Sequence, residues 1–231
     1  MVLQFEGIRN ARDFSEYGNR LCIRAAHLHD MTDGDVEILR NTCHLQTVID
    51  LRTGMEREEA PDRVVDGVCY YSIPLFDEAM IGISHEKNTD SMAGAGAVPD
   101  MAGLYRDIVT TDSSVEQIKK VMKIILASDR EGAVLWHCTE GKDRCGIISA
   151  LYMMTLGADD EAIMRDYLKT NETAEKRAEM YYQKALEKSG NEILANKVRN
   201  AFLAKSEYME PILPVLRGMS AWSNRLKFGN Q

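Results

Sequence analysis

The sequence predicts an α/β protein with a short, mostly parallel central sheet flanked by helices and followed by a helical C-terminal part. Short apolar runs alternate with amphipathic helical segments as far as Gly157, and helical periodicity then continues almost to the end of the chain. One apolar run also leads through a short polar loop directly into a helix, as in parallel βα units.

Three apolar runs are predicted to be buried strands. They comprise residues 47–51, 68–73 and 133–136, of which the last is expected to be central. Pro74 ends the second run, because proline has no amide proton for a sheet ladder. The mixed pattern of residues 2–28 predicts short strands near a sheet edge.

Helices are predicted from capping signals and apolar periodicity. Thr32 or Asp33 is expected to cap a helix that reaches Cys43. Ser113 followed by Glu116 has the pattern of a capping box before an amphipathic helix. A helix over 145–156 is expected to end at Gly157, and later helical faces carry Ile163, Tyr167, Leu194, Val198, Ala201 and Phe202.

We expect a single domain over residues 1–231 that contains two unusual segments. Residues 77–103 hold four of the sixteen glycines and few periodic apolar positions, which predicts a long loop. This loop is interpreted either as a lid or as an insertion without a role. Residues 171–231 are predicted to form a helical extension, with an interaction surface as an alternative role.

Composition favours an ordinary globular protein of the cytoplasm. A net charge of −8 and a pI near 5.2 argue against nucleic acid as a partner. No stretch approaches the roughly 18 consecutive apolar residues of a membrane span, and no secretory signal is visible. The five cysteines form no CxxC pair, so neither disulfides nor structural zinc are expected, and His27 and His29 are interpreted as strand residues.

The loop between the strand at 133–136 and the next helix is the most informative segment about function. It runs His-Cys-Thr-Glu-Gly-Lys-Asp-Arg over residues 137–144. Of the five cysteines, only Cys138 has an arginine, Arg144, six positions later. Backbone N–H groups in a strand-to-helix turn form an anion nest, and the helix dipole adds positive potential. The loop therefore predicts a phosphate-binding site.

The same field is expected to keep the thiol of Cys138 ionised. A helix N-terminus with a neighbouring cation lowers a cysteine pKa from about 8.5 to roughly 3.5–7.5, and the thiolate is the nucleophile. Arg144 can donate two hydrogen bonds to phosphate, and Gly141 permits the turn. We predict a phosphocysteine intermediate that water hydrolyses, with the phosphate bound by Thr139, Glu140, Gly141, Lys142 and Arg52.

The loop resembles the signature His-Cys-x-x-Gly-Lys-Asp-Arg-Thr-Gly of bacterial tyrosine and lipid phosphatases. Further similarities extend over roughly residues 5–170; they lie at Asn10–Asp13, Arg24–Leu28, Asp50–Arg52 with Glu56 and Pro61, and Leu156–Gly157 with Asp166–Leu168. The resemblance implies a protein tyrosine phosphatase-like fold and no metal or other cofactor. It also implies activity on phosphotyrosine proteins, and in some members on phosphoserine, phosphothreonine or phosphoinositides.

One residue departs from that family's pattern. Cys145 stands where the family has threonine or serine, whose hydroxyl is thought to hydrogen-bond the leaving thiolate. Because a thiol is a weaker donor, we expect slower breakdown of the phosphocysteine. A Cys138–Cys145 disulfide is a hypothesis for oxidising conditions. The alternative is a small residue that is merely tolerated.

A general acid must protonate the leaving oxygen, and the resemblance suggests Asp143 for this role. Asp107 and Asp77 are rival candidates, since each lies on or near a segment that could fold over the pocket. The alternative role of Asp143 is an ion pair with Lys142 or Arg144.

Other residues are expected to support the loop. Lys142 would add a second cation for substrates with more than one phosphate, such as phosphoinositides, or it would face solvent. His137 is expected to hold the loop and tune the cysteine. Arg12, Asp13 and Arg52 are expected to support the loop or contact substrate, with ordinary ion pairs as the alternative. Arg52 is favoured among them because it follows a strand.

Two other functions fit parts of the pattern. A rhodanese-like or arsenate-reducing enzyme also uses an anion-binding cysteine loop, but Gly-Lys-Asp-Arg is unusual for either. A scaffold that binds phosphorylated partners without turnover needs neither nucleophile nor acid, whereas Cys138, Arg144 and candidate acids are all present here. The sequence therefore favours a cysteine-dependent phosphatase that acts on a phosphorylated protein or a phosphoinositide.

Overall fold

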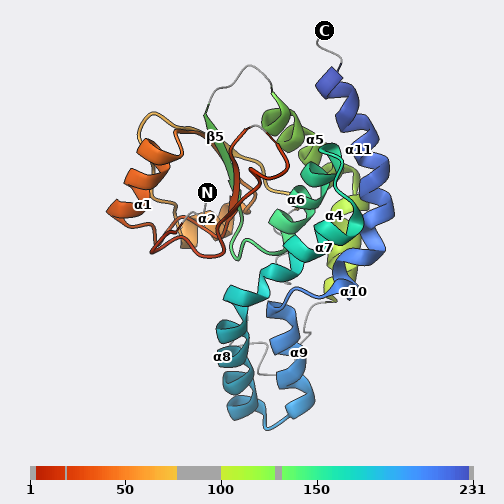
Figure 1. Cartoon of the computed structure of the whole chain (residues 1–231). Coiled ribbons are helices and arrows are strands. Elements are labelled where there is room, and N and C mark those ends of the chain that lie inside the picture. Colours follow the sequence, from red (N-terminus) through yellow and green to blue (C-terminus); the bar gives the residue numbers. More distant parts are fainter. Residues whose placement is uncertain (1–3, 19, 77–99, 128–131, 229–231) are drawn as a thin grey trace.

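A computed structural model describes residues 4–18, 20–76, 100–127 and 132–228, with side chains as far as residue 221 (Figure 1). Most of the loop predicted over 77–103 lies outside these residues. Its last three positions are helical instead, because α4 (Met101–Thr110) begins there and buries Met101 and Leu104 in the core.

Five short strands form one sheet in the order β1-β2-β5-β3-β4. The edge strand β1 is antiparallel to β2, and the other three pairs are parallel. The strands are β1 (Arg12–Asp13), β2 (Cys22–Ala25), β3 (Leu45–Asp50), β4 (Cys69–Ser72) and β5 (Ala133–His137). The predicted α/β class with a mostly parallel sheet is confirmed, and β5 is central as expected.

Helices cover both faces of the sheet and then continue to the C-terminus, as predicted (Figure 1). Before β5 lie α1 (Asp33–Glu37), the π-helix η1 (Ile38–Thr42), α2 (Gly54–Glu59), α4 and α5 (Asp112–Leu126). After β5 lie α6 (Asp143–Thr155), α7 (Asp160–Lys169), α8 (Asn171–Ser189), α9 (Glu192–Phe202), α10 (Ser206–Met209), the 3₁₀-helix η3 (Glu210–Ile212) and α11 (Leu213–Phe228).

Successive side chains of β5 point into two different cores. Val134 and Trp136 pack with apolar residues of α4, α5, α6, α7 and α11, whereas Ala133 and Leu135 pack on the face that η1 covers. This alternation is the period of two that a strand imposes, so β5 is buried on both faces.

Helix α6 is the centre of the larger layer. Every residue from Arg144 to Thr155 is buried, and α6 contacts the sheet together with α5, α7 and α11. A helix enclosed on all sides has little freedom to shift, because protein interiors are closely packed. The loop that precedes α6 is therefore attached to two rigid elements, β5 and α6.

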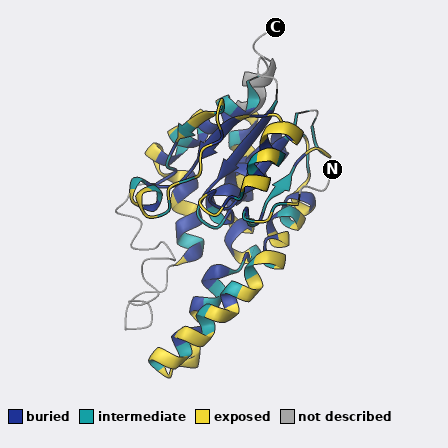
Figure 2. Cartoon of the chain, turned by 90° about the vertical axis from the view of Figure 1, so that its left-hand side faces the viewer, coloured by how far each residue is buried: buried dark blue, intermediate teal, exposed yellow. Residues whose placement is uncertain are grey.

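The C-terminal helices form two different structures. Helices α8 and α9 make a hairpin that projects from the body with a small core of its own, including Ala178, Val198 and Phe202 (Figures 1 and 2). In contrast, α10 and α11 return to the main core through Met209 and Leu216. The projecting part of the expected 171–231 extension is thus only its first half.

The predicted helix starts are confirmed at one position and wrong at two. Thr32 forms a capping box with Asp35 at the start of α1. The Ser113–Glu116 capping box is not formed, because α5 already begins at Asp112, after an N-cap residue that makes no side-chain cap bond. Helix α6 begins at 143 rather than 145, so its first turn includes the end of the predicted loop.

Among the described residues, no helix combines the length and apolar character needed to cross a lipid bilayer.

Candidate active site

The loop of residues 138–142 joins the C-terminal end of β5 to the N-terminus of α6. Cys138 follows the strand directly and is 2% exposed. Arg144 lies in the first turn of α6 and is also buried. The structure therefore places both residues of the predicted Cys–Arg pair at the N-terminus of α6.

Gly141 is required by the path of the loop. Its φ is +65°, and a Cβ added there would lie 2.6 Å from the carbonyl carbon of Ala25. An L-residue is disfavoured at this φ, and no larger side chain fits against β2. The expectation that this position needs glycine is confirmed.

The carbonyl groups of the loop are bound from the β2 side. The Asn10 amide donates to the carbonyl oxygens of Glu140 at 3.1 Å and Gly141 at 3.0 Å. The fully buried Arg24 donates from Nη2 to the carbonyls of Gly141 at 2.6 Å and Lys142 at 3.2 Å. These bonds hold three successive carbonyl groups on the β2 side and so fix the path of the loop backbone, as an anion nest needs.

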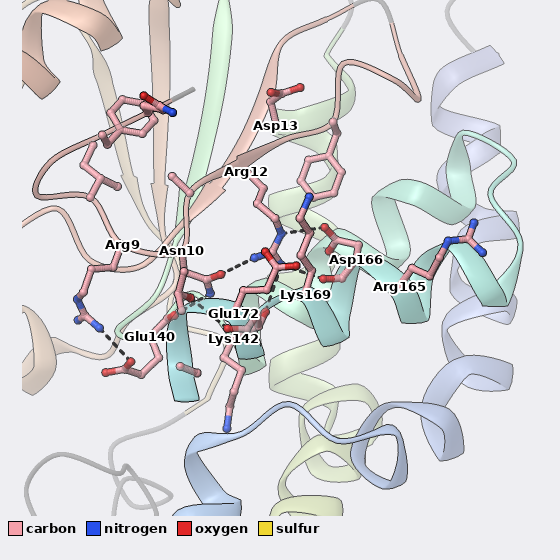
Figure 3. A pocket seen from close by; sticks show the side chains of 18 of the residues that line it. Arg9, Asn10, Arg12, Asp13, Glu140, Lys142, Arg165, Asp166, Lys169 and Glu172 are labelled. Carbon is pink, nitrogen blue, oxygen red and sulfur yellow. Dashed lines mark hydrogen bonds and ion pairs between the residues drawn. The ribbon is translucent and has the colours of Figure 1, made fainter. Parts of the chain in front are cut away.

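Asp166 of α7 orients the arginines on this side of the loop (Figure 3). It accepts from Arg24 at 2.8 Å and from Arg12 at 3.0 Å. Burial alone would raise the pKa of Asp166, but the two guanidiniums lower it. Arg12 also donates to Thr170 and Asn10, so it supports the loop rather than facing the site.

A cavity of about 1120 Å³ lies behind these residues, between the N-terminal segment, the loop and α7–α8 (Figure 3). Arg12, Glu140 and Lys169 help to line it, whereas Cys138 and Arg144 do not. It is thus a separate cavity on the outer side of the loop.

The thiol of Cys138 is acidic despite its burial. Desolvation would raise its pKa from 9.0, but three interactions outweigh this effect and lower the pKa to about 6. They are a hydrogen bond from the thiol of Cys145, the charge of Arg144, and a hydrogen bond from the backbone N–H of Cys145. Cys138 is therefore a thiolate at neutral pH, which is the nucleophilic form.

Cys145 is the proton donor of this pair. Burial, and then the hydrogen bond and charge of Cys138, raise the pKa of Cys145 well above its ordinary value. Its thiol therefore stays protonated at neutral pH, 3.6 Å from the Ala25 carbonyl oxygen. Cys145 thus occupies the position at which the phosphatase signature has threonine or serine, and it donates a hydrogen bond to the nucleophile from there.

Glu56 fixes the guanidinium of Arg144. Two hydrogen bonds of 2.6 Å join Nη1 and Nη2 to the two carboxylate oxygens, and Thr139 donates its hydroxyl to the same carboxylate at 2.5 Å. Burial would raise the pKa of Glu56, but Arg144 and these bonds lower it to about 2. Among the described residues, no acceptor bonds to Arg144 Nε, which leaves that edge for a phosphate oxygen.

His137 and Arg52 form a buried network under the loop. His137 Nε2 lies 3.1 Å from Asp62, and Arg52 Nη2 lies 2.8 Å from both Asp50 and Asp62. The two carboxylates and His137 are close enough to hold a metal ion, but Arg52 already supplies the positive charge between them. The predicted phosphate contact of Arg52 is therefore wrong in this structure, because its side chain is 1% exposed and bound to carboxylates.

Asp143 lies in the first turn of α6 beside a pair of buried tyrosines. Its carboxylate accepts from Tyr105 at 2.7 Å, and Tyr105 bonds Tyr167 at 2.7 Å. Asp107 is exposed and lies two residues from Tyr105 on α4, about 200° around the helix, and so points away from Asp143. Asp77 lies outside the described residues.

Lys142, Glu140 and Asp13 do not point toward a bound phosphate, and the alternative ion pair of Lys142 with Asp143 is formed. The Lys142 ammonium is buried, 3.3 Å from Asp143, and bonds carbonyls at the end of α9, so it does not face a substrate (Figure 3). Glu140 pairs with Arg9 at 3.1 Å and Arg177 at 2.9 Å, which directs its side chain outward. Asp13 accepts only local bonds from Ser15 among the described residues, so no contact links it to the loop.

Sequence reasoning did not assign roles to four residues that hold the site: Asn10, Arg24, Glu56 and Asp166. Each lies in a segment that resembles the phosphatase family, and this resemblance is the sequence signal that could have pointed to their roles. Their roles depend on contacts across at least 83 positions of sequence, such as Glu56 with Thr139 and Arg144.

Comparison with known proteins gives relatives of one kind. A tyrosine-protein phosphatase of Nostoc commune is 32% identical over 145 residues, covering 63% of this chain and 46% of that protein. The chain thus spans less than half the length of this relative. The triple specificity protein phosphatase PtpB of Mycobacterium tuberculosis is 27% identical over 197 residues, covering 74% of this chain and 70% of that protein.

One solved structure and one family model complete the comparison. The crystal structure of TpbA from P. aeruginosa in complex with pTyr covers 91% of this chain and 95% of that chain, with 14% identity and a TM-score of 0.33. The model of the tyrosine phosphatase family matches residues 3–220, which is nearly the whole chain. The chain therefore belongs to the tyrosine phosphatase family.

Proposed function

We propose that this protein is a cysteine-dependent phosphomonoesterase that acts on phosphotyrosine proteins through a phosphocysteine. The observation that carries the proposal is the position of Cys138 between β5 and the N-terminus of α6, with Arg144 in the first turn of that helix. The thiol and backbone N–H of Cys145 and the charge of Arg144 lower the pKa of Cys138 to about 6, which favours the thiolate. Family membership supports the same chemistry.

In the first step the Cys138 sulfur attacks phosphorus, forming a P–S bond while the bond from phosphorus to the ester oxygen breaks. The nest and Arg144 stabilise the charge on the transferred phosphoryl oxygens. Asp143 protonates the leaving oxygen, since the other described candidate, Asp107, points away from the loop.

In the second step water attacks the phosphocysteine and the P–S bond breaks. The proton of the attacking water passes to the carboxylate of Asp143, and the thiolate of Cys138 leaves. The Cys145 thiol donates to that thiolate as charge returns to it. A thiol donates more weakly than a hydroxyl, so this second step is expected to limit turnover.

The substrate range is proposed to extend beyond phosphotyrosine. The name of the mycobacterial relative, a triple specificity protein phosphatase, supports a broad range. We propose phosphoserine and phosphothreonine as the further substrates of this chain. Phosphoinositides have weaker support, because Lys142, the cation expected to bind a second phosphate, is buried against α9. We also propose a reducing, cytoplasmic location, because all five cysteines are free and a reducing compartment protects a thiolate from oxidation.

A substrate panel tests the function. Phosphotyrosine peptides, phosphoserine peptides and phosphoinositides are incubated with the wild type and with Cys138→Ser, and released phosphate is measured. We expect phosphotyrosine hydrolysis by the wild type and none by the variant. Binding of phosphopeptide by both proteins without hydrolysis by the wild type would instead identify a scaffold without turnover.

A further inference from the structure

The side chain of Lys142 leaves the loop toward the base of the α8–α9 hairpin (Figure 3). Its Nζ donates to the carbonyl oxygen of Ala201 and lies 3.4 Å from that of Leu203. The residue is only 1% exposed. Lys142 therefore joins the loop to the end of α9.

The C-terminus of α9 is a favourable place for an ammonium group. The last four carbonyls of a helix have no intrahelical partners, and the helix dipole places negative potential there. A buried ammonium needs such partners, because an uncompensated charge is strongly disfavoured in the interior. Two carbonyls of the α9 end and the carboxylate of Asp143, 3.3 Å away, meet this need.

The segment that receives Lys142 is fixed to the start of the hairpin. The Asn171 side chain donates to the Ala204 carbonyl at 2.9 Å and accepts from the Ala204 N–H at 2.8 Å. Asn171 is the first residue of α8, and Ala204 follows α9. The two ends of the hairpin therefore meet at the point that Lys142 contacts.

A second, weaker contact joins the loop to the hairpin. Arg177 of α8 donates to Glu140 at 2.9 Å, with side-chain exposures of 30% and 16%. Partly exposed ion pairs contribute little, so this contact is expected to add to the Lys142 anchor rather than replace it.

We propose that Lys142 is a positioning residue that anchors the phosphate-binding loop to the base of the α8–α9 hairpin, and that it is not a ligand of the substrate. This inference rests on the proposed phosphatase function. Order at the hairpin base then determines the position of the loop backbone, including Asp143. The hairpin is thereby part of the active-site framework although it projects from the body.

Four variants test the proposal. Lys142→Met keeps the length of the side chain and removes its charge, and Lys142→Arg restores a cation. Asn171→Ala loosens the receiving segment without touching the loop. Lys197→Met is the matched control, because Lys197 is an exposed lysine of the same helix α9.

Two kinds of measurement separate anchoring from substrate binding. Hydrogen exchange over residues 192–205 reports on the hairpin base. The values of kcat and KM for p-nitrophenyl phosphate, a phosphotyrosine peptide and a phosphoinositide, over a range of pH, report on the loop. For Lys142→Met we expect faster exchange and a loss of kcat by the same factor for every hydrolysed substrate. That factor is about 10²-fold if the loop moves by about 1 Å.

The other three variants are expected to show how far the effect depends on the charge of residue 142 and on the hairpin base. Lys142→Arg should restore part of the rate, Asn171→Ala should give the Lys142→Met pattern with a smaller amplitude, and Lys197→Met should match the wild type. Selective loss of phosphoinositide hydrolysis in Lys142→Met, with unchanged exchange, would show that Lys142 binds substrate and would overturn the proposal. Unchanged exchange and rates in that variant would overturn it as well.

Failure of the phosphatase function is distinguishable from failure of the anchor. If the wild type hydrolyses no phosphate ester, the enzymatic assignment is wrong. The exchange measurement then still decides whether Lys142 holds the loop to the hairpin, because it needs no turnover.

Discussion

The two flanks of the phosphate-binding loop are held by different chemistry. On the β2 flank, Asn10 and Arg24 bind the carbonyl oxygens of the loop backbone. On the β3–α2 flank, Glu56 binds the guanidinium of Arg144, and Asp62 binds His137. One flank thus determines where the amides point, and the other determines where the charged side chain points. The comparison predicts that damage to the two flanks has opposite effects on the acidity of Cys138.

Glu56→Gln is expected to have the largest effect, because it removes the charge partner of a buried guanidinium. Breaking a buried ion pair on one side costs about 3–5 kcal/mol, so the free energy of unfolding should fall by that order. The midpoint for alkylation of Cys138 should move below about pH 6, because Arg144 is no longer neutralised. Chemical denaturation and the pH dependence of iodoacetamide inactivation measure the two effects.

The same carboxylate gives the wild type an acid-sensitive contribution to stability. The pKa of Glu56 is about 2 in the folded protein, against an ordinary 4.5. A lowered folded-state pKa stabilises the protein fully above the ordinary value, and the stabilisation is lost as the pH falls from about 4.5 toward 2. In Glu56→Gln this part of the pH dependence should be missing. An unchanged acid limb in the variant would show that Glu56 is not the group responsible.

Asp143→Asn is expected to affect the rate most strongly, because Asp143 is the proposed proton donor. A smaller loss of stability should accompany it, because the variant also removes a charge partner of the buried Lys142 ammonium. General acid catalysis contributes about 10²–10⁴-fold, so hydrolysis of alkyl phosphates should fall within that range. Hydrolysis of p-nitrophenyl phosphate, whose leaving group needs little protonation, should fall less. The alkaline limb of the kcat/KM profile for alkyl phosphates should also flatten, because a general acid must be protonated to act.

Asp107→Asn is the matched control for that experiment, because Asp107 is exposed on α4 and far around the helix from Tyr105. It should retain the wild-type profile. If Asp107→Asn flattens the alkaline limb and Asp143→Asn does not, Asp143 is not the general acid.

Asn10→Ala tests the β2 flank and is expected to have a moderate effect. It removes two hydrogen bonds to loop carbonyls, which together contribute about 1–3 kcal/mol. Asn10 also has a φ of +54°, which asparagine tolerates better than alanine. The loosened amides should hold the thiolate less well, so the alkylation midpoint should rise above about pH 6. A shift in the same direction as in Glu56→Gln would contradict the comparison of the two flanks.

The sequence predicted the fold and the nucleophile well because both depend on local patterns. The strand at 133–136, the loop and the buried helix after it could be read from apolar runs and from one cysteine–arginine spacing. The direction of long side chains could not be read in this way. Lys142 points to α9 and Arg52 to Asp62 because of partners 59 and 10 positions away, and no local pattern encodes those contacts.

The capping error at Ser113 has a related cause. The Ser-x-x-Glu pattern is present, but α5 follows α4 so closely that the helix starts at Asp112. Packing of the two helices against the core decides the start, and Glu116 pairs with Lys119 instead of capping. A local capping signal thus has less influence than burial of an apolar helix face.

Cys145→Ser is expected to give the smallest shift in the pH midpoint for alkylation of Cys138. It tests the hydrogen bond from residue 145, which lies next to β2, to the Cys138 thiolate. Serine restores a hydroxyl donor next to Ala25 and Cys138, so the alkylation midpoint should stay near or slightly below pH 6 and phosphocysteine breakdown should accelerate. Burst kinetics with p-nitrophenyl phosphate separate the two steps. The burst should shrink in the variant, because the second step no longer limits turnover.

The same position decides the response to peroxide. Oxidation of the Cys138 thiolate gives a sulfenic acid, and attack by the Cys145 sulfur would expel water and form a disulfide. Because the two sulfurs are already hydrogen-bonded, we expect this disulfide to form reversibly in the wild type, and Cys145→Ser to overoxidise at Cys138 instead. Mass spectrometry after peroxide treatment, with and without dithiothreitol, distinguishes the products. If the wild type is overoxidised at Cys138 and never pairs, Cys145 serves as a hydrogen-bond donor alone, and the β2 flank gives the nucleophile no protection from oxidation.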